Sequence, residues 1–128
     1  MKFTLKTIIS ATAQYIYTTW LSSKGHSAMT GTDATITAVV GKKFTAWDGY
    51  ISGTNLELIP NSKIVQAWRT TSFKDSDEDS NIEIVLNEIK GKTELTLTHS
   101  NIPNDGEDYK KGWEDYYFKP MKDYFLEK

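Results

Sequence analysis

The chain has 128 residues, of which 38% are hydrophobic and 25% charged, as is typical of one soluble globular domain. Its 17 acidic and 15 basic side chains give a net charge of −2, which offers no electrostatic case for nucleic-acid binding. It has no cysteine, and no apolar run is long enough to span a membrane. We therefore expect a single domain over residues 1–128, located in the cytoplasm, with no cofactor or metal and no nucleic-acid partner.

The N-terminal segment changes from a strand pattern to a helix pattern. Residues 2–9 alternate apolar and polar side chains, which predicts a strand. Apolar residues at helical spacing over 11–21 predict a short helix, with Ser10 as its N-cap. Residues 22–31 contain two glycines and several serines, so we expect a turn with one further helical turn, and we place His26 in it.

From Thr32 to about residue 99 the periodicity is two, which predicts an antiparallel meander with turns at 41–42, 48–49, 60–61 and 90–91. A two-residue turn at 48–49 pairs Trp47 with Tyr50, and one at 41–42 places Ala38 opposite Thr45. This register predicts one inward face for the first strands of the meander, made of Ile36, Ala38, Thr45, Trp47, Tyr50, Ser52, Thr54, Leu56 and Leu58.

The turn at 90–91 gives a second register, in which the apolar side chains of two strands lie opposite one another. It pairs Leu86 with Leu95, Ile84 with Leu97 and Ile82 with His99. Nearly every other position on these strands is polar, which predicts one covered and one solvated face. For the strand at 63–71 both orientations remain open, with either Ile64, Gln66 and Trp68 or Val65, Ala67 and Arg69 pointing inward.

An acidic segment at 74–81 separates two of the predicted strands. Asp75, Asp77 and Asp79 match the first ligand positions of an EF-hand calcium loop. However, Ser80 stands where the glycine is required, and Leu86 stands where the last glutamate is required. We therefore interpret the segment as a solvated hairpin loop.

After a turn-rich connection at 100–108, the last segment has the pattern of an amphipathic helix. Its apolar positions follow helical spacing and form one mostly aromatic stripe, made of Trp113, Tyr116, Tyr117, Pro120, Met121, Tyr124 and Phe125. Pro120 has no N–H to donate to the carbonyl of Tyr116, so we expect the helix to bend there.

The predicted order β-α-α-β6-α is an α+β arrangement in which a curved antiparallel sheet of about seven strands wraps around a long C-terminal helix. It resembles the helix-grip fold of the START/Bet v 1-like superfamily of polyketide cyclases, dehydrases and lipid-transport proteins. Three motifs are more specific, namely FTAWDGYISG at 44–53 with LELIP at 56–60, IVQAWR at 64–69, and LTLTH at 95–99 with GW at 112–113 and YFKPM at 117–121. These motifs resemble the homologues of the activator of heat-shock protein 90 ATPase.

The superfamily resemblance implies a hydrophobic small molecule bound between the sheet and the C-terminal helix. The cavity would be lined by apolar and aromatic side chains, with few polar groups to orient the ligand. The residues we assign to it are Trp20, Trp47, Tyr50, Leu56, Trp68, Leu86, Leu97, His99, Trp113, Tyr117 and Met121. The alternative that these side chains simply fill the core remains open.

The family resemblance implies a second function, that of an interaction module acting on a chaperone ATPase. Opposite charges in the two halves agree with it, because residues 1–74 carry eight basic and three acidic side chains whereas residues 75–128 carry seven basic and fourteen acidic ones. The eukaryotic co-chaperone of this family has a further N-terminal domain, and this chain resembles only the C-terminal one.

A third function is a cyclase or dehydrase activity with His99 or a buried tyrosine as acid or base. No paired carboxylates and no nucleophile-base motif support this reading, so we expect a binding protein rather than an enzyme.

Overall fold

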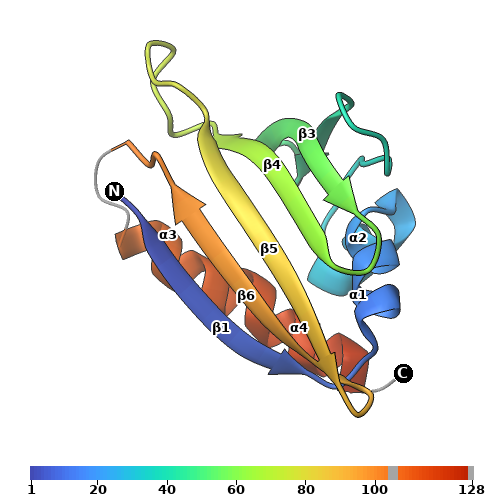
Figure 1. The fold of residues 1–128 in the computed structure, drawn as a ribbon. Coiled ribbons are helices and arrows are strands. Elements are labelled where there is room, and N and C mark those ends of the chain that lie inside the picture. The colour runs from blue at the N-terminus through green and yellow to red at the C-terminus, as the bar shows by residue number, and fades with distance from the viewer. Residues whose placement is uncertain (104–106, 127–128) are drawn as a thin grey trace.

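The computed structural model describes residues 1–103 and 107–126, and it is a curved antiparallel sheet with helices on one face (Figure 1). The strands are β1 (Phe3–Ile9), β2 (Lys43–Ala46), β3 (Ile51–Ile59), β4 (Lys63–Thr70), β5 (Ser80–Ile89) and β6 (Lys92–Ser100). The helices are α1 (Ala13–Trp20), α2 (Ser23–Thr30), α3 (Glu107–Trp113), the π-helical turn η1 (Glu114–Phe118) and α4 (Lys119–Leu126). Of the described helices, none has both the length and the apolar character needed to cross a membrane.

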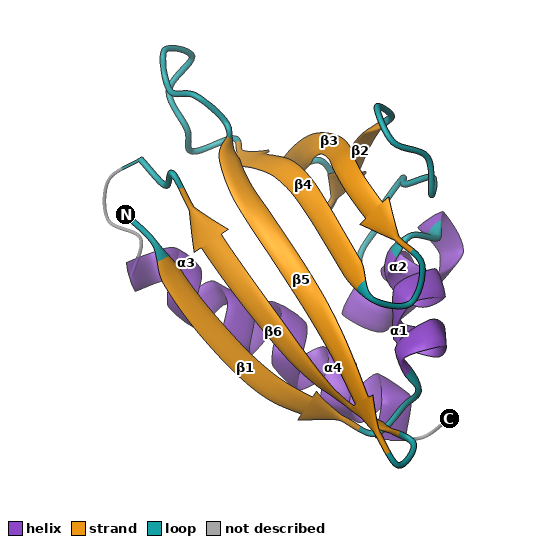
Figure 2. Ribbon diagram, viewed as in Figure 1, coloured by secondary structure: helices purple, strands orange, loops and turns teal. Residues whose placement is uncertain are grey.

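The sheet order is β1-β6-β5-β4-β3-β2, so the first strand pairs with the last (Figure 2). The segment α3-η1-α4 runs across one face of the sheet, and α1 and α2 lie beside it (Figure 1). This arrangement confirms the predicted α+β helix-grip fold, with six strands in the described chain where about seven were expected.

The missing strand is the one expected between residues 32 and 40, which contains only an isolated bridge between Thr35 and Thr45. The backbone of this segment pairs with side chains instead. Ser23 Oγ and Ser27 Oγ of α2 each donate to a carbonyl and accept from an N–H of the segment, at Ile36 and Ala34 respectively. Because these groups are already paired, they cannot form a strand ladder.

The register of β2 with β3 is the expected one, since Thr45 lies opposite Ser52. The predicted face is wrong for the paired residues of β2 and β3, although Ile36, which was predicted for the same face, is buried. The inward side chains are Phe44, Ala46 and Ile51, which are buried, whereas Thr45 is exposed and Ser52 half-exposed. A register shift between Asn55 and Glu57 then bends β3 at a bulge.

Leu56 lies at the bulge in β3, on the face opposite to that of Ile51 and Asn55. This side chain is 47% exposed on the outside of the sheet, so our placement of Leu56 in the cavity is wrong. Asn55 turns inward instead, where it is 1% exposed. Its Nδ2 donates to the carbonyls of Thr37 and Val39, which holds the irregular 32–40 segment against the sheet.

The β5–β6 hairpin confirms the second predicted register, with Leu86 opposite Leu95, Ile84 opposite Leu97 and Ile82 opposite His99. All six side chains are buried. The structure also resolves the ambiguity in β4, because Ile64, Gln66 and Trp68 point inward and are at most 4% exposed.

Two short helices follow β1. Helix α1 is capped by Thr12 rather than Ser10, since the Thr12 side chain accepts from the N–H of Tyr15. Helix α2 is a complete helix where we expected one helical turn. Ser22 caps its start, and Gly31 ends it in the left-handed conformation (φ 85°) that glycine adopts readily. His26 therefore lies in a helix and is buried, contrary to our placement in a turn.

The C-terminal helix contains a turn with one additional residue just before Pro120. The N–H of Lys119 donates to the carbonyl of Glu114, five residues back, which forms the π turn η1. Such a turn rotates the residues that follow it relative to an α-helix. Consequently Phe118 is buried together with Trp113, Tyr117, Met121 and Phe125, whereas Tyr116, which we expected on the inward stripe, is 59% exposed.

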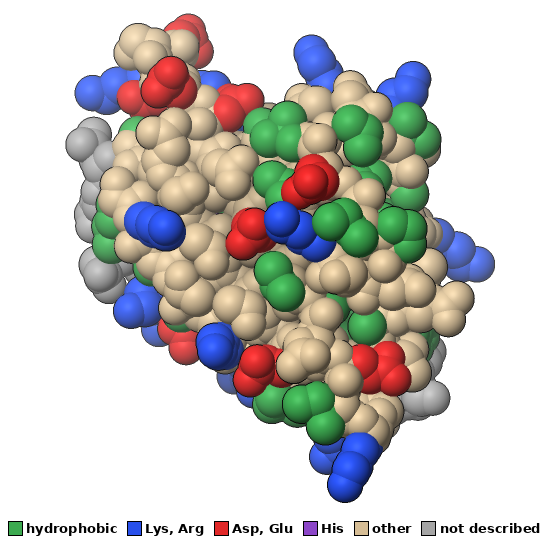
Figure 3. Space-filling view, viewed as in Figure 1, with side chains coloured by type: hydrophobic (Ala, Val, Ile, Leu, Met, Phe, Trp, Pro, Cys, Tyr) green, Lys and Arg blue, Asp and Glu red, His purple; other side chains and the backbone are tan. Residues whose placement is uncertain are grey.

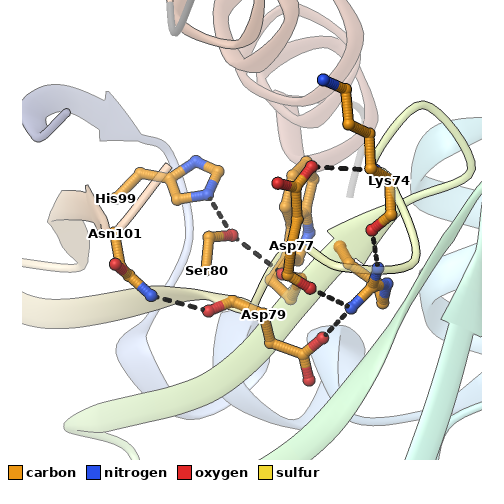
Figure 4. A network of polar contacts seen from close by, with 8 residues as sticks. Lys74, Asp77, Asp79, Ser80, His99 and Asn101 are labelled. Carbon is orange, nitrogen blue, oxygen red and sulfur yellow. Dashed lines mark hydrogen bonds and ion pairs between the residues drawn. The ribbon is translucent and has the colours of Figure 1, made fainter. Parts of the chain in front are cut away.

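The outer face of the sheet carries charges of both signs interspersed with separate apolar groups (Figure 3). Lys63 forms ion pairs there with Glu57 and Glu83, at 3.2 and 3.5 Å. Arg69 also points outward, where it donates to the carbonyls of Lys74 and Asp77 and to Asp79 Oδ1. These contacts hold the acidic 71–79 loop (Figure 4), which agrees with our interpretation of it as a hairpin connection.

Candidate functional site

A pocket of about 290 Å³ lies between the 47–50 turn, β4 and the C-terminal helix, and it opens to solvent. Its lining comprises Trp47, Tyr50, Ile51, Trp68, Asp108, Tyr109, Gly112, Trp113, Tyr116 and Tyr117. Seven of these ten residues are aromatic and one is charged. The pocket is therefore an apolar, aromatic site with a single carboxylate.

The 47–50 turn brings Trp47 to the pocket in an unusual backbone conformation. Trp47 has φ 52° and Asp48 φ 56°, both in the left-handed region that large side chains rarely adopt. The turn is held from outside, because the N–H of Asp48 donates to the carbonyl of Asp33 and the N–H of Asp33 donates to Asp48 Oδ1. Strained residues fixed in this way are often found at functional sites.

The C-terminal helix supplies the opposite wall. Tyr109, Trp113 and Tyr116 follow one another at helical spacing, and Gly112 leaves open space between them, since its missing Cβ would meet no atom closer than 4.0 Å. The Tyr109 hydroxyl and Thr70 Oγ1 form a hydrogen bond of 3.0 Å, which connects the start of α3 to the end of β4.

His99 anchors this helix to the sheet. Trp113 Nε1–H can only donate, and it donates to His99 Nδ1 at 3.0 Å, so the neutral ring carries its proton on Nε2. The Nε2–H group donates a hydrogen bond to Ser80 Oγ, with 2.8 Å between the two heavy atoms. Ser80 Oγ in turn donates to the carbonyl of Trp68 (Figure 4). Burial lowers the pKa of His99 to about 3. The imidazole is therefore neutral and fully hydrogen-bonded.

His26 anchors the same helix from the other side. Its Nδ1–H donates to the carbonyl of Trp20 at 2.8 Å, and its Nε2 accepts from the Tyr117 hydroxyl at 2.9 Å. Burial lowers the pKa of His26 and raises that of Tyr117, so both groups remain neutral. Trp47 lowers the pKa of Tyr117, but this effect is smaller than that of burial. The Trp47 Nε1 atom itself is buried and has no hydrogen-bond partner among the residues that the structure describes.

The structure divides the cavity residues that we predicted into three groups. Trp47, Tyr50, Trp68, Trp113 and Tyr117 line the pocket. Leu56 is exposed elsewhere. The remaining residues are buried in the core without lining this pocket, and they are Trp20, Leu86, Leu97, His99 and Met121.

His99 accordingly lies beneath the pocket rather than in its lining. It is 0% exposed, and partners occupy both of its ring nitrogens. A general base needs a free nitrogen within reach of the substrate. The arrangement thus gives His99 a structural role and does not support its use as the base of a cyclase or dehydrase.

Five pocket residues were not assigned to the cavity from the sequence, namely Ile51, Asp108, Tyr109, Gly112 and Tyr116, and one anchor, His26, was missed as well. Asp108, Tyr109 and Gly112 belong to α3, whose beginning we placed after residue 108. The available signal was that Tyr109 lies four residues before Trp113, which extends the aromatic stripe by one helical turn. His26 carried no comparable signal in its sequence neighbourhood.

Within residues 1–103 and 107–126, no group of three or more His, Cys, Asp or Glu side chains is placed to bind a metal ion. The chemistry that the pocket offers is therefore that of aromatic faces, tyrosine hydroxyls and the Asp108 carboxylate.

Comparison with known proteins identifies relatives along nearly the whole chain. Residues 10–125 match the family model described as Activator of Hsp90 ATPase homolog 1-like protein. The human Activator of 90 kDa heat shock protein ATPase homolog 1 is 31% identical over 125 residues, which is 97% of this chain and 37% of that protein. A relative from Dictyostelium discoideum is 36% identical over 89 residues, covering 67% of this chain and 23% of its own. The chain thus spans 37% of the human relative's length and 23% of the Dictyostelium relative's length.

Solved structures give a similar picture. An HSP90 activator from Plasmodium falciparum is 25% identical with a TM-score of 0.88, covering 97% of this chain and 95% of that one. The Aha1 dimer from Colwellia psychrerythraea is 19% identical with a TM-score of 0.81, covering 98% and 96%, and it shares the fold. The resemblance expected from the sequence motifs is therefore confirmed.

Proposed function

Because the chain belongs to the family of Activator of Hsp90 ATPase homolog 1-like proteins, we propose that it binds an Hsp90-type chaperone and raises its ATPase rate. It would do so as one domain in the cytoplasm. The observation that carries this proposal is the similarity to the Plasmodium protein, which is named an HSP90 activator. The two folds match over 95% of that protein's solved chain.

The proposal concerns this domain, which corresponds to 37% of the human protein. A standard protein–protein interface buries roughly 800 Å² of accessible surface on each partner. The total accessible surface of this domain is 6931 Å². An interface would therefore occupy about a tenth of it.

Titration of the isotope-labelled protein with the Hsp90-type chaperone of its own organism tests the binding step. We expect the amide signals that change to cluster on one continuous surface. Titration with an unrelated ATPase of similar size serves as the control. Signals that do not change at saturating chaperone, or that change equally with the unrelated ATPase, would contradict a specific complex.

We also propose a second function, in which the pocket holds an apolar small molecule. What supports it is the lining itself, with aromatic side chains around a space of about 290 Å³ that opens to solvent. Pockets of roughly 300–1,000 Å³ with mostly apolar linings are typical of small-molecule sites. This function and chaperone binding do not exclude each other.

Native mass spectrometry of the protein purified gently from its own host tests ligand binding. We expect a reproducible added mass that disappears in Gly112→Leu, because a leucine side chain would grow into the open space beside Tyr116. Lys111→Leu is the matched control, since Lys111 precedes Gly112 on the helix but does not line the pocket. An added mass that persists in Gly112→Leu would place the ligand elsewhere.

A further inference from the structure

The rings that line the pocket contact one another at several different angles. Trp47 and Tyr116 make an interplanar angle of 71° at a centroid distance of 5.5 Å, and Trp68 and Tyr109 make one of 90° at the same distance. Trp68 and Trp113 meet at 36°, and Trp113 and Tyr117 meet at 41°. The ring planes therefore differ in direction, and rings from the 47–50 turn, β4 and the C-terminal helix together enclose the pocket as an aromatic box.

The face of an aromatic ring is the negative part of its quadrupole and attracts cations. A box with several such faces favours a rounded cation over an extended apolar chain. Quaternary ammonium groups are the cations that aromatic boxes recognise best, because they carry positive charge on a surface that is itself apolar and weakly hydrated.

The charges around the pocket have the matching sign. Asp108 is the charged residue among those that line it. An adjoining depression shares Tyr50, Asp108 and Tyr109 with the pocket and adds Lys74 and Asp77. Two carboxylates and one ammonium group thus line the two adjoining depressions, and this excess of negative charge favours a cationic ligand over a fatty acid or another anion.

The volume also fits. The pocket volume of about 290 Å³ is close to the lower end of the range of roughly 300–1,000 Å³ that is typical of small-molecule sites. This is enough for a trimethylammonium group with a short chain.

We propose that the pocket binds the quaternary ammonium group of a small molecule, with the aromatic box around the cation and Asp108 at its entrance. The inference rests on the second proposed function and specifies the class of its ligand. It concerns the same pocket, but it requires that a positive charge on the ligand improves binding, whereas an apolar site has no such requirement.

Choline and 3,3-dimethylbutan-1-ol provide the test, because they have the same shape and differ in charge. Their binding to the whole protein is measured by amide chemical-shift changes of the labelled protein. We expect choline to bind roughly tenfold more tightly than the neutral alcohol, which corresponds to about 1.4 kcal/mol. A peptide that carries trimethyllysine is titrated in parallel, to distinguish a free small molecule from a modified partner protein.

Two variants locate the effect. Tyr116→Leu keeps apolar bulk but removes a ring from a residue that is 59% exposed, so the fold is preserved, and we expect choline binding to fall roughly threefold. Asp108→Asn removes the carboxylate, and it should weaken choline binding by a similar factor without changing the binding of the neutral alcohol. Asp115→Asn is the control, because Asp115 lies on the same helix and does not line the pocket.

Each outcome decides the matter. Preference for choline together with the variant pattern supports the proposal. Equal or tighter binding of the neutral alcohol overturns it while leaving the apolar-ligand function in place. If neither compound shifts the signals of pocket residues, the proposal is also overturned, and the mass measurement on Gly112→Leu decides separately whether an apolar ligand binds. Tight binding of the peptide alone would overturn the assignment to a small molecule.

Discussion

Replacement of Gly53 by alanine is expected to destabilise the protein by about 3 kcal/mol, the upper end of the range for inserting atoms into a packed region. Gly53 lies in β3 between Phe44 of β2 and Trp68 of β4. A Cβ at this position would overlap the backbone carbonyl of Ala67 and come within 2.8 Å of the Phe44 ring. The carbonyl belongs to a neighbouring strand, so relief requires the strands to move apart.

The comparison is with Gly112→Ala, in which the added Cβ has open space, since the nearest atom is Tyr116 Cδ2 at 4.0 Å. Alanine in a helix is favoured over glycine by about 1 kcal/mol, so this variant should be as stable as the natural protein or slightly more stable. Urea unfolding followed by tryptophan fluorescence measures both. A Gly53→Ala variant that unfolds at the same urea concentration as the natural protein would show that β3 accommodates a side chain at this point.

Acidification below pH 6.5 is the second change with a large expected effect. The pKa of His99 is about 3 in the folded protein and about 6.5 when unfolded, so the unfolded chain takes up the proton first. Stability from the neutral ring is therefore complete above pH 6.5 and is lost as the pH falls from 6.5 toward 3. Between pH 7 and pH 5 the expected loss from His99 is about 2 kcal/mol.

The two histidines respond differently to a proton, although burial lowers the pKa of both. A protonated His26 can still donate to the Tyr117 hydroxyl, which is able to accept. A protonated His99 would direct an N–H at Trp113 Nε1–H, which can only donate. We therefore expect His99 to account for most of the pH dependence.

Urea unfolding at pH 7 and pH 5 of the natural protein and of His99→Gln measures this contribution. The variant should be less stable at pH 7, yet it should lose about 2 kcal/mol less than the natural protein between the two pH values. His26→Gln, compared in the same way, reports the smaller contribution. An identical loss in His99→Gln and the natural protein would mean that other groups, such as carboxylates, cause the acid sensitivity.

The β5–β6 hairpin illustrates what the sequence could predict. Its two strands alternate apolar and polar side chains with the exception of Val85, and Lys90 and Gly91 at the turn both have the positive φ that a two-residue hairpin turn requires. Pattern and turn chemistry thus agree on one register. The C-terminal helix was recognisable for the same reason, because its apolar stripe extends over several turns.

The errors arose where side chains replace backbone pairing or where a strand gains a residue. Ser23, Ser27 and Asn55 occupy the backbone groups of residues 34–39, so the alternating pattern there does not lead to a strand. Leu56 points outward because Ile51 and Asn55 point inward. The bulge after Asn55 then returns Leu58 to the inner face, opposite Ile64. Neither effect follows from periodicity, since both depend on residues brought together by the complete fold.

The candidate site was predictable in its chemistry but only partly in its composition. Trp47, Trp68 and Trp113, which the sequence analysis assigned to the cavity, line the pocket, because large aromatic residues at a sheet-helix interface tend to lie inward. The position of α3 relative to the 47–50 turn, which brings Asp108 and Tyr109 to the same pocket, could not be read from spacing.

The ATPase rate of the cognate Hsp90-type chaperone, measured while this protein is titrated to saturation, tests the proposed function most directly. Our account predicts a saturable rise in the rate, with half-saturation at the concentration at which the amide signals of the labelled protein change. An inhibitor specific for the chaperone's ATP site should abolish the entire rate, which excludes a contaminating ATPase. A chaperone rate that stays constant while the complex demonstrably forms would contradict an activator and leave a binding protein.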